Sequence, residues 1–525
     1  MSTIDILGID LGTTNSAISI WNPEIGKSIV LRNREEDRLT PSVVMFDDAT
    51  GQPIVGKPAM DRLISHPNDV VYSVKRFIGT TFNDKWVRQD QQNVTYRVQE
   101  TPQHKVVIQV ADRELTPTQV SAEVLRKLKN DAEIALGGQK ITQAVITVPA
   151  YFNEAQRHAT KEAGELAGLQ VPRIINEPTA SALAFGLGSK PQTVAVYDLG
   201  GGTFDISILR IEHGLFRVKA TGGDTHLGGD DFDLAIVKWM KEAFRQEHGV
   251  DLPDEDNNSL RALLREEAEK AKIALTTATE APIHIPDVLK VEGESPGLDL
   301  ILTSTIFEER IQPFIERSLE ICAEVVKKAE MNVEEIDQVL LVGGQTRTPA
   351  LRRAIENHFG WVLNTSVNPD EAVAQGAAIL GARLCGYLKE QVKLWDVIPL
   401  SLGIELADGK MEPILHANEQ IPVTVWRKGS QAFTTQHDGQ ERIRFRIFQG
   451  EQPVAAENVL IGEVTLTLTT ARPVGEPRIN CMFKVDHDGI LHVRAEDADT
   501  ESEPVEEMFD HMYNKKQEEI DQRPS

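Results

Sequence analysis

Hydrophobic and polar residues follow two different patterns along the chain, with a change near residue 390. Before that point, short segments such as 194–197 (VAVY) and 339–342 (VLLV) are apolar throughout. Such runs are typical of strands that are covered on both faces of a sheet. Longer segments with helical periodicity separate them, which predicts an α/β architecture for this region.

Three segments of the first region are predicted to be helices. Thr116 supplies an N-cap and Pro117 a first helical residue for an amphipathic helix that extends through Leu136. Residues 162–167 and 259–275 are also helix-like, and the second segment is rich in Glu, Lys, Ala and Leu. From the pattern alone, that second segment is a charged, solvated helix.

Beyond Pro399 the polar and apolar residues alternate strictly. The segments 442–447 (RIRFRI), 463–469 (EVTLTLT), 478–485 (RINCMFKV) and 491–495 (LHVRA) share this period of two. Short alternating strands separated by Gly- and Asp-containing turns predict an antiparallel β-sandwich with one solvated face. The boundary between the two regions is predicted near residues 390–398.

Length and charge narrow the class of protein. The chain has 525 residues, and single cores stop growing at ~250–300 residues, so several domains are expected. The net charge of −25 argues against a large nucleic-acid or anionic-membrane surface, although it leaves room for a local basic strip. We therefore expect no nucleic-acid partner and no membrane partner.

The cysteines and the termini point to a protein of the cytoplasm. The only cysteines are Cys322, Cys385 and Cys481, with no Cys-x-x-Cys pair, so neither a disulfide framework nor a thiolate metal site is predicted. The N-terminus has no signal-peptide pattern, and no apolar run reaches the ~20 residues that span a bilayer. From Glu501 onward the chain is acidic and then of mixed charge, and a frayed helix or disorder is expected there.

The strongest chemical signal is a repeated loop. Residues 9–14 (IDLGTT) recur in altered form at 197–203 (YDLGGGT), and each copy predicts a β-hairpin with an Asp at the entrance of its turn. Glycines let backbone N–H groups converge on an anion, Thr hydroxyls add donors, and Asp carboxylates suit hydrated Mg²⁺. One Asp-x-Gly turn is an ordinary hairpin connection, whereas two matched copies predict loops that face one another and clamp the phosphates of a nucleotide.

A third glycine turn, at 342–349 (VGGQTRTP), follows a strand and opens a helix. Its paired glycines permit close approach of a flat ring or a ribose, and Arg347 is placed to stack on adenine or to contact phosphate. This turn is predicted to form the nucleoside end of the site. The chain has no GxxxxGK[ST] motif and no strand-linked GxGxxG motif, so neither a P-loop nor a Rossmann site is indicated.

Longer segments then occur in a distinctive order: 8–16 (GIDLGTTNS), 148–153 (VPAYFN), 176–180 (NEPTA), 198–205 (DLGGGTFD), 342–347 (VGGQTR), 399–405 (PLSLGIE) and 488–493 (DGILHV). Together they resemble the 70-kDa heat-shock protein (DnaK-type) chaperones over nearly the whole chain. The resemblance implies a two-lobed, actin-like (duplicated ribonuclease H-like) nucleotide-binding domain followed by an antiparallel β-sandwich. It implies an ATPase domain at 1–390 with lobes 1–190 and 191–390, a linker at 391–396, a peptide-binding sandwich at 397–505 and a short charged tail at 506–525.

The resemblance also assigns roles to individual residues. Lys75 is expected to orient the attacking water near the γ-phosphate, and Asp10 and Asp198 to hold Mg²⁺ mostly through water. The full catalytic set is Lys75, Asp10, Glu177, Asp198 and Thr203. The residues expected to bind ATP or ADP are Gly12, Thr13, Thr14, Gly200, Gly201, Gly202, Thr203, Glu269, Lys272, Thr276, Gly343, Gly344, Arg347 and Asp370. Pro149 and Arg157 match the family's relay between nucleotide and linker.

The chain departs from the family pattern in three places. The linker has Val392-Lys-Leu-Trp-Asp396 in place of the usual Val-Leu-Leu-Leu-Asp, and a Lys there is expected to weaken coupling between domains. Ile443 matches a pocket residue of the peptide site, whereas Ala407 and Gln436 lie near positions that usually arch over the peptide. The family's helical lid is expected to be missing, which predicts fast peptide exchange.

The resulting hypothesis is an ATP-dependent molecular chaperone with a slow basal ATPase, acting in protein folding and the stress response as a monomer. Its implied partners are unfolded hydrophobic peptides, a J-domain co-chaperone and a nucleotide-exchange factor. Three alternatives stay open: a chaperone-related regulator or exchange factor, an actin-like filament former, and a small-molecule kinase of the same superfamily. Retention of Lys75, Asp10, Asp198 and Thr203 disfavours an inactive ATPase, and the β domain disfavours a filament subunit and a kinase.

Overall fold

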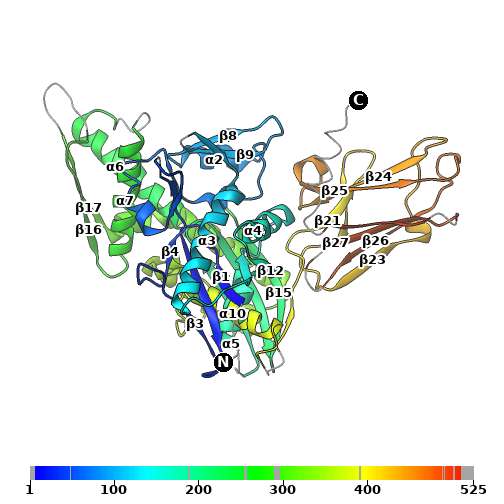
Figure 1. Ribbon diagram of the computed structural model, residues 1–525, viewed down its shortest axis with the longest axis horizontal. Coiled ribbons are helices and arrows are strands. Elements are labelled where there is room, and N and C mark those ends of the chain that lie inside the picture. Colours follow the sequence, from blue (N-terminus) through cyan, green and yellow to red (C-terminus); the bar gives the residue numbers. More distant parts are fainter. Residues whose placement is uncertain are drawn as a thin grey trace.

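Two α/β lobes lie side by side in the computed structural model, and a smaller all-β unit follows them in the chain (Figure 1). The described residues are 6–47, 49–110, 112–186, 190–252, 257–288, 296–388, 392–486, 489, 491–500 and 503–509. Within these ranges, none of the helices has the length and apolar character needed to cross a membrane.

The first lobe is built on a mixed sheet with the strand order β12-β11-β1-β2-β3. Its strands are β1 (Ile6–Asp10), β2 (Asn15–Asn22), β3 (Lys27–Val30), β11 (Gln143–Val148) and β12 (Gln170–Asn176), and the short β4 (Thr40–Pro41) pairs with β2. Helix α3 (Pro117–Ala135) begins with a capping box in which Thr116 and Gln119 exchange hydrogen bonds, as the sequence predicted. Helix α4 (Glu154–Leu166) packs beside α3. It contains residues 162–166 of the predicted helical segment 162–167, and Ala167 is its C-cap.

The second lobe repeats this plan with the strand order β19-β18-β13-β14-β15-β20. Its strands are β13 (Gln192–Leu199), β14 (Phe204–Glu212), β15 (Leu215–Asp224), β18 (Gln338–Val342), β19 (Leu363–Asn364) and β20 (Lys393–Trp395). The predicted strands 194–197 and 339–342 lie in β13 and β18. Helices α6 (Gly229–His248), α8 (Ser304–Lys328) and α9 (Pro349–Phe359) pack around the largest apolar core of the chain.

Two helices tie the lobes together. Helix α5 (Glu177–Gly186) follows β12 of the first lobe yet packs against β13 and β14, whereas α10 (Ala372–Leu384) packs against β1 and β2. The two helices also contact each other, and a Cβ on Gly376 would overlap the Ala180 carbonyl group. Packing of this density leaves no room for an added methyl group at Gly376, so α5 and α10 are in close contact where the two lobes meet.

Smaller elements extend the outer end of each lobe. In the first lobe they are β5 (Val44–Phe46), β6 (Pro53–Val55), β7 (Val70–Val71), β8 (Arg97–Glu100), β9 (Val106–Val110), β10 (Arg113–Leu115), α1 (Lys57–Met60) and α2 (Lys85–Gln92). In the second lobe they are α7 (Asn258–Ala274), β16 (Glu280–Ile285) and β17 (Leu298–Thr303). The predicted helix 259–275 is therefore confirmed as α7, capped by Asn257.

The C-terminal unit is the predicted antiparallel sandwich. One sheet contains β21 (Leu402–Glu405), β22 (Met411–Leu415), β24 (Arg442–Gln449) and β25 (Val459–Thr467), and the other contains β23 (Val423–Arg427), β26 (Ile479–Val485), β27 (Leu491–Asp497) and β28 (Val505–Phe509). The alternating residues Ile479, Cys481, Phe483 and Val485 are all buried between the sheets.

One segment differs from its predicted form, and the predicted linker contains a strand that the sequence pattern did not indicate. Residues 505–509 were expected to begin a helix or a disordered stretch, but they form the edge strand β28, because their backbone pairs with β27. The rest of the predicted tail, 510–525, lies outside the described residues. The predicted linker contributes Lys393–Trp395 as a strand that pairs in parallel with β15. Lys393 is exposed there while Val392 is buried, so the lysine stays outside the apolar contacts of this strand.

Candidate functional site

The two repeated loops are hairpin turns in equivalent places of the two lobes. In the first, β1 pairs with β2 and Asp10 lies opposite Ala17. In the second, β13 pairs with β14 and Asp198 lies opposite Asp205. The predicted hairpins, each with an aspartate at its entrance, are therefore confirmed.

The turns of the two hairpins touch. A Cβ added to Gly202 would lie 2.7 Å from Thr13 Cγ2 and 2.8 Å from Thr13 Oγ1, and a Cβ on Gly201 would overlap Thr14 Oγ1. Thr14 Oγ1 and Asp198 Oδ2 are buried and have no hydrogen-bond partner in the described part of the chain. Orphaned polar atoms in a glycine-lined gap are what a phosphate group or a hydrated cation would satisfy.

The third glycine turn closes on the second hairpin. Gly343 has φ +80°, and a Cβ there would lie 2.5 Å from the Leu199 carbonyl carbon and 2.8 Å from Asp198 Oδ1. Gly229, the first residue of α6, donates its N–H to the Gly200 carbonyl oxygen at 2.9 Å. The second hairpin turn thus has the third glycine turn on one side and the start of α6 on the other.

Lys75 lies in a 3₁₀ turn (Val74–Phe77) of the first lobe and is buried. Its Nζ is 2.6 Å from Glu177 Oε1, and both side chains are less than a tenth exposed. Glu177 begins α5 directly after β12, which places it at the carboxyl end of that edge strand. A buried lysine beside a single acceptor carboxylate is oriented by that contact and remains available to a second anion.

Burial raises the pKa of three aspartates around this ion pair. The pKa of Asp10 rises from 3.8 to about 7, because of desolvation and then the nearby Glu177 charge. Desolvation, followed by the Glu177 charge, raises the pKa of Asp205 to about 8. The same two effects raise the pKa of Asp198 well above its usual value. Carboxyl groups with raised pKa values packed together are an arrangement that a divalent cation would stabilise in the ionised form.

Two residues of this cluster were missed by the sequence analysis. Asp205 accepts the backbone N–H of Tyr151 at 3.2 Å, and Thr147 donates its hydroxyl to Asp10 Oδ1 at 3.3 Å. For Asp205 a signal existed, because a hairpin with a turn at 200–203 places residue 205 opposite residue 198. Thr147 lies in the middle of an apolar strand, where the sequence carries no comparable signal.

These pKa shifts predict a pH-dependent stability. Asp10 and Asp205 stay protonated in the folded protein between about pH 4 and pH 7 to 8, where the unfolded chain has already released their protons. Their stabilising contribution is therefore complete below about pH 4 and is lost as the pH rises through about 7 to 8. We expect the Tm of the nucleotide-free protein to fall over this range.

Thermal unfolding followed by circular dichroism at a series of pH values measures the slope. Asp205→Asn removes one titrating group and should make the slope shallower, whereas the exposed Asp61→Asn should leave it as in the wild type. A slope that is equal in all three proteins would refute the assignment.

The residues expected around the nucleoside come from three elements. Lys272 on α7 lies 2.8 Å from Asp233 Oδ1 on α6 and donates to the Gly229 carbonyl oxygen at 3.2 Å. A Cβ on Gly229 would lie 2.7 Å from Gln345 Oε1 of the third turn. Burial raises the pKa of Asp233 to about 7, and the nearby Glu269 charge adds to this effect. The charged helix α7 thus directs Lys272 inward, which its sequence pattern did not indicate.

The remaining expected nucleotide residues lie around this set. Arg347 Nη2 is 2.5 Å from Asp370 Oδ2, and this pair borders Gly344. Thr276 follows the end of α7 and donates its hydroxyl to the Ile273 carbonyl oxygen. This hydrogen bond is local to the end of the helix and does not connect Thr276 to the other expected nucleotide residues. Thr203 closes the second turn by accepting the Gly200 N–H at 3.1 Å.

The three expected peptide-binding residues lie apart from the nucleotide residues, in the sandwich. Ala407 is exposed in the turn between β21 and β22, and Gln436 is exposed before β24. Ile443 is buried within β24 in the core of the sandwich.

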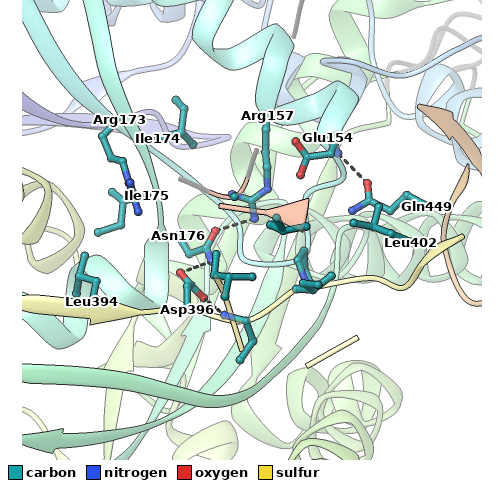
Figure 2. Close-up of a pocket in the computed structure, with 16 residues that line it drawn as sticks. Glu154, Arg157, Arg173, Ile174, Ile175, Asn176, Leu394, Asp396, Leu402 and Gln449 are labelled. Atoms are coloured by element: carbon teal, nitrogen blue, oxygen red, sulfur yellow. Dashed lines mark hydrogen bonds between the residues drawn. The ribbon is translucent and has the colours of Figure 1, made fainter. Parts of the chain in front are cut away.

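Figure 2 shows the contact region between the first lobe and the sandwich, with Arg157, Asn176 and Asp396 pointing toward one another. Arg157 Nη2 donates to Asn176 Oδ1 at 2.7 Å, and Asn176 Nδ2 donates to Asp396 Oδ2 at 3.1 Å. Asn176 directly precedes Glu177, so hydrogen bonds and one peptide bond connect the linker aspartate to the partner of Lys75. A Gln449 side chain of the sandwich also accepts the Glu154 N–H at 2.9 Å.

The sequence of this chain is similar to those of known proteins over most of its length. The sequence model of the family described as Hsp70 protein matches residues 6–523. The chaperone protein DnaK of Thermotoga petrophila is 45% identical over 498 residues, which cover 94% of this chain and 78% of that protein. The chaperone protein DnaK of Thermus thermophilus is 46% identical over 497 residues, with the same shares covered.

Proposed function

Because this chain belongs to the Hsp70 protein family, we propose that it is an ATP-dependent molecular chaperone, in which ATP hydrolysis controls the binding and release of unfolded hydrophobic peptide segments. The observation that carries the proposal is the contact between the two glycine turns, whose entrance aspartates Asp10 and Asp198 interact electrostatically with the buried Lys75–Glu177 pair. The expected domain bounds, 1–390, 391–396, 397–505 and 506–525, form part of this proposal.

The site residues suit hydrolysis by positioning and charge, without a covalent intermediate. In the proposed arrangement, backbone N–H groups at 12–14 and 201–203 bind the phosphates, and Lys272, Arg347 and Asp370 border the nucleoside. Asp10 and Asp198 would hold Mg²⁺ largely through water, and this ion would neutralise phosphate charge. Lys75 orients the attacking water, and Glu177 fixes the Lys75 ammonium group.

We add Asp205 to the catalytic set. It lies opposite Asp198 across the hairpin, and its pKa of about 8 reflects how strongly a proton is held there in the absence of a metal ion. A neighbouring cation would lower that pKa, so the Asp205 carboxylate would then be able to accept the proton that the attacking water releases.

The hydrogen-bonded connection from Lys75 to the linker offers a route for coupling. A shift of Glu177 would move Asn176, and Asn176 holds the linker through Asp396. Differential binding of ATP and ADP by two lobe arrangements would thereby bias the sandwich, where Ala407, Gln436 and Ile443 are the proposed peptide contacts.

A steady-state ATPase assay with and without a J-domain protein and an extended hydrophobic peptide tests this function. We expect slow basal turnover that rises several-fold when both are present. Asp396→Asn should lower the stimulated rate while the basal rate stays near wild type, because this residue acts on the linker and not on the nucleotide. If neither partner stimulated the wild-type protein, the proposed chaperone cycle would be refuted. If the wild-type protein showed no basal turnover, the proposed ATPase activity would be refuted as well.

A further inference from the structure

A row of basic and aromatic side chains crosses the edge of the second-lobe sheet. Arg210 on β14 is the register partner of Arg217 on β15, and Arg217 is the register partner of Trp395 on β20. Register partners project from the same face of a sheet at a strand spacing of ~4.8 Å. The next row on this face contains Glu212, Leu215 and Lys393. We name these six residues the β15 strip.

Arg217 is the centre of the β15 strip. Its guanidinium carbon lies 4.4 Å from the centroid of the Trp395 ring, a cation–π contact. Its Nε is buried without a hydrogen-bond acceptor, and no carboxylate of the described residues lies within ion-pair distance of it. The charge of Arg217 is therefore held in place by packing and is not neutralised by a carboxylate.

The β15 strip contains more positive than negative charge. Arg210 binds Glu212 at 2.8 Å and donates to the Thr193 hydroxyl at 3.1 Å. The hydrogen bond from Arg210, together with the charges of Arg210, Arg217 and His213, lowers the pKa of Glu212. The nearby carboxylate of Asp337 accepts the Thr193 N–H. The exposed Lys219 and Lys393 have no ion-pair partner among the described residues.

The local excess of positive charge at the β15 strip contrasts with the net charge of −25 for the whole chain. At physiological ionic strength the Debye length is ~8 Å, so a ligand at the β15 strip responds to its near charges and little to the distant acidic surface. Leu215 and Trp395 add half-buried apolar surface within the strip. Basic groups around an aromatic ring are complementary to carboxylates that flank an apolar side chain.

We propose that the β15 strip is a docking surface for an acidic segment of a partner protein. Aspartate or glutamate side chains of that segment would pair with Arg217, Arg210 and Lys393, and an apolar residue would cover Trp395. The strip crosses only three strands, a width of ~10 Å, which is short for the track of phosphates along which nucleic acids are bound. A short acidic peptide fits this extent better.

Binding there would also act on the linker. Trp395 belongs to β20, so a partner that spans β14, β15 and β20 would hold Lys393–Trp395 on the sheet. Asp396, the next residue, carries the hydrogen bond to Asn176. The proposed partner would therefore stabilise the docked linker from outside, independently of the nucleotide site.

Fluorescence anisotropy of the full chain with short labelled peptides tests the proposal. The probes are a Glu- and Leu-containing peptide, its Gln-for-Glu and Lys-for-Glu counterparts, and a single-stranded DNA oligonucleotide. We expect saturable binding of the Glu peptide that salt weakens, with loss of at least about tenfold in affinity for Arg217→Gln and for Lys393→Glu. Any binding of the Gln or Lys peptide in the sandwich should not be weakened in these two variants. Because Lys393 is exposed, Lys393→Glu does not depend on refolding around a buried group.

The matched control is Arg245→Glu, an equal change of charge on the exposed side of α6. Its affinity for the Glu peptide should equal that of the wild type. Three results would each overturn the proposal: no saturable binding of the Glu peptide, equal loss in the Arg245 variant, or a loss of affinity for the DNA or the Lys peptide in the Arg217 and Lys393 variants as large as that for the Glu peptide. ATPase activity measured in parallel shows separately whether the nucleotide site works.

Discussion

Lys75→Ala is expected to reduce ATP turnover at least about 100-fold while the protein still binds nucleotide. The Lys75 ammonium is the cation that faces Glu177 in this buried site, and Asp10, Asp198 and Asp205 surround it. Alanine would leave the phosphate-binding turns intact but would remove the positive charge beside the expected position of the attacking water. Single-turnover hydrolysis and nucleotide affinity should be measured on the same preparation.

Stability must be followed in the same variant. Removing one member of a buried ion pair leaves Glu177 uncompensated and costs about 3–5 kcal/mol where no other group takes its place. Lys57→Ala, at an exposed position of α1, is the matched control and should change neither turnover nor Tm. Wild-type turnover in a folded Lys75→Ala protein would show that the lysine does not act in hydrolysis.

Gly343→Ala is expected to lower nucleotide affinity about 100-fold or more. Two effects add at this position. Its φ of +80° disfavours any residue with a Cβ, at about 1–2 kcal/mol, and the added methyl would overlap the Leu199 carbonyl group and Asp198 Oδ1. Relief of that overlap requires the second hairpin turn to move, and in the proposed arrangement this turn supplies N–H groups to the phosphates.

Gly360→Ala separates these two effects. Gly360 ends α9 with φ +66°, and a Cβ there would meet no atom within 4 Å. It carries the same backbone strain without the overlap, so stability should fall by about 1 kcal/mol while nucleotide affinity is unchanged. Isothermal titration with ADP compares the two variants, and equal affinities would show that the third turn does not shape the site.

Local patterns in the sequence were sufficient for much of the fold. Strict alternation at 478–485 predicts which residues of β26 are buried, because side chains of a strand point to opposite faces in turn. The Thr116–Pro117 start of α3 follows from capping, which involves only neighbouring residues. The repeated Asp-Gly-Thr turns predict two hairpins, and their similarity to each other predicts that they face one another.

Those local patterns could not predict contacts between segments that are distant in the sequence. Residues 505–509 carry too little apolar character to be distinguished from a tail, and it is the free edge of β27 that makes them a strand. Likewise, 393–395 is a strand because β15 offers an edge, and the contact of Trp395 with Arg217 joins positions 178 residues apart in the chain. Hydrogen bonding to a sheet edge depends on what lies beside a segment, not on its own composition.

By itself, then, the sequence determined the residue types of the proposed nucleotide site and the elements that carry them: Asp10 and Asp198 at hairpin turns, glycines where backbone approaches closely, and Lys75 through its family motif. Only the tertiary structure decided that Lys75 meets Glu177, that Asp205 joins the carboxylates, and that Lys272 turns inward to Asp233. The physical reason is the separation along the chain over which each interaction acts. Turn geometry and strand period act over a few residues, whereas burial and ion pairing depend on which distant segments the packing of α5 and α10 brings together.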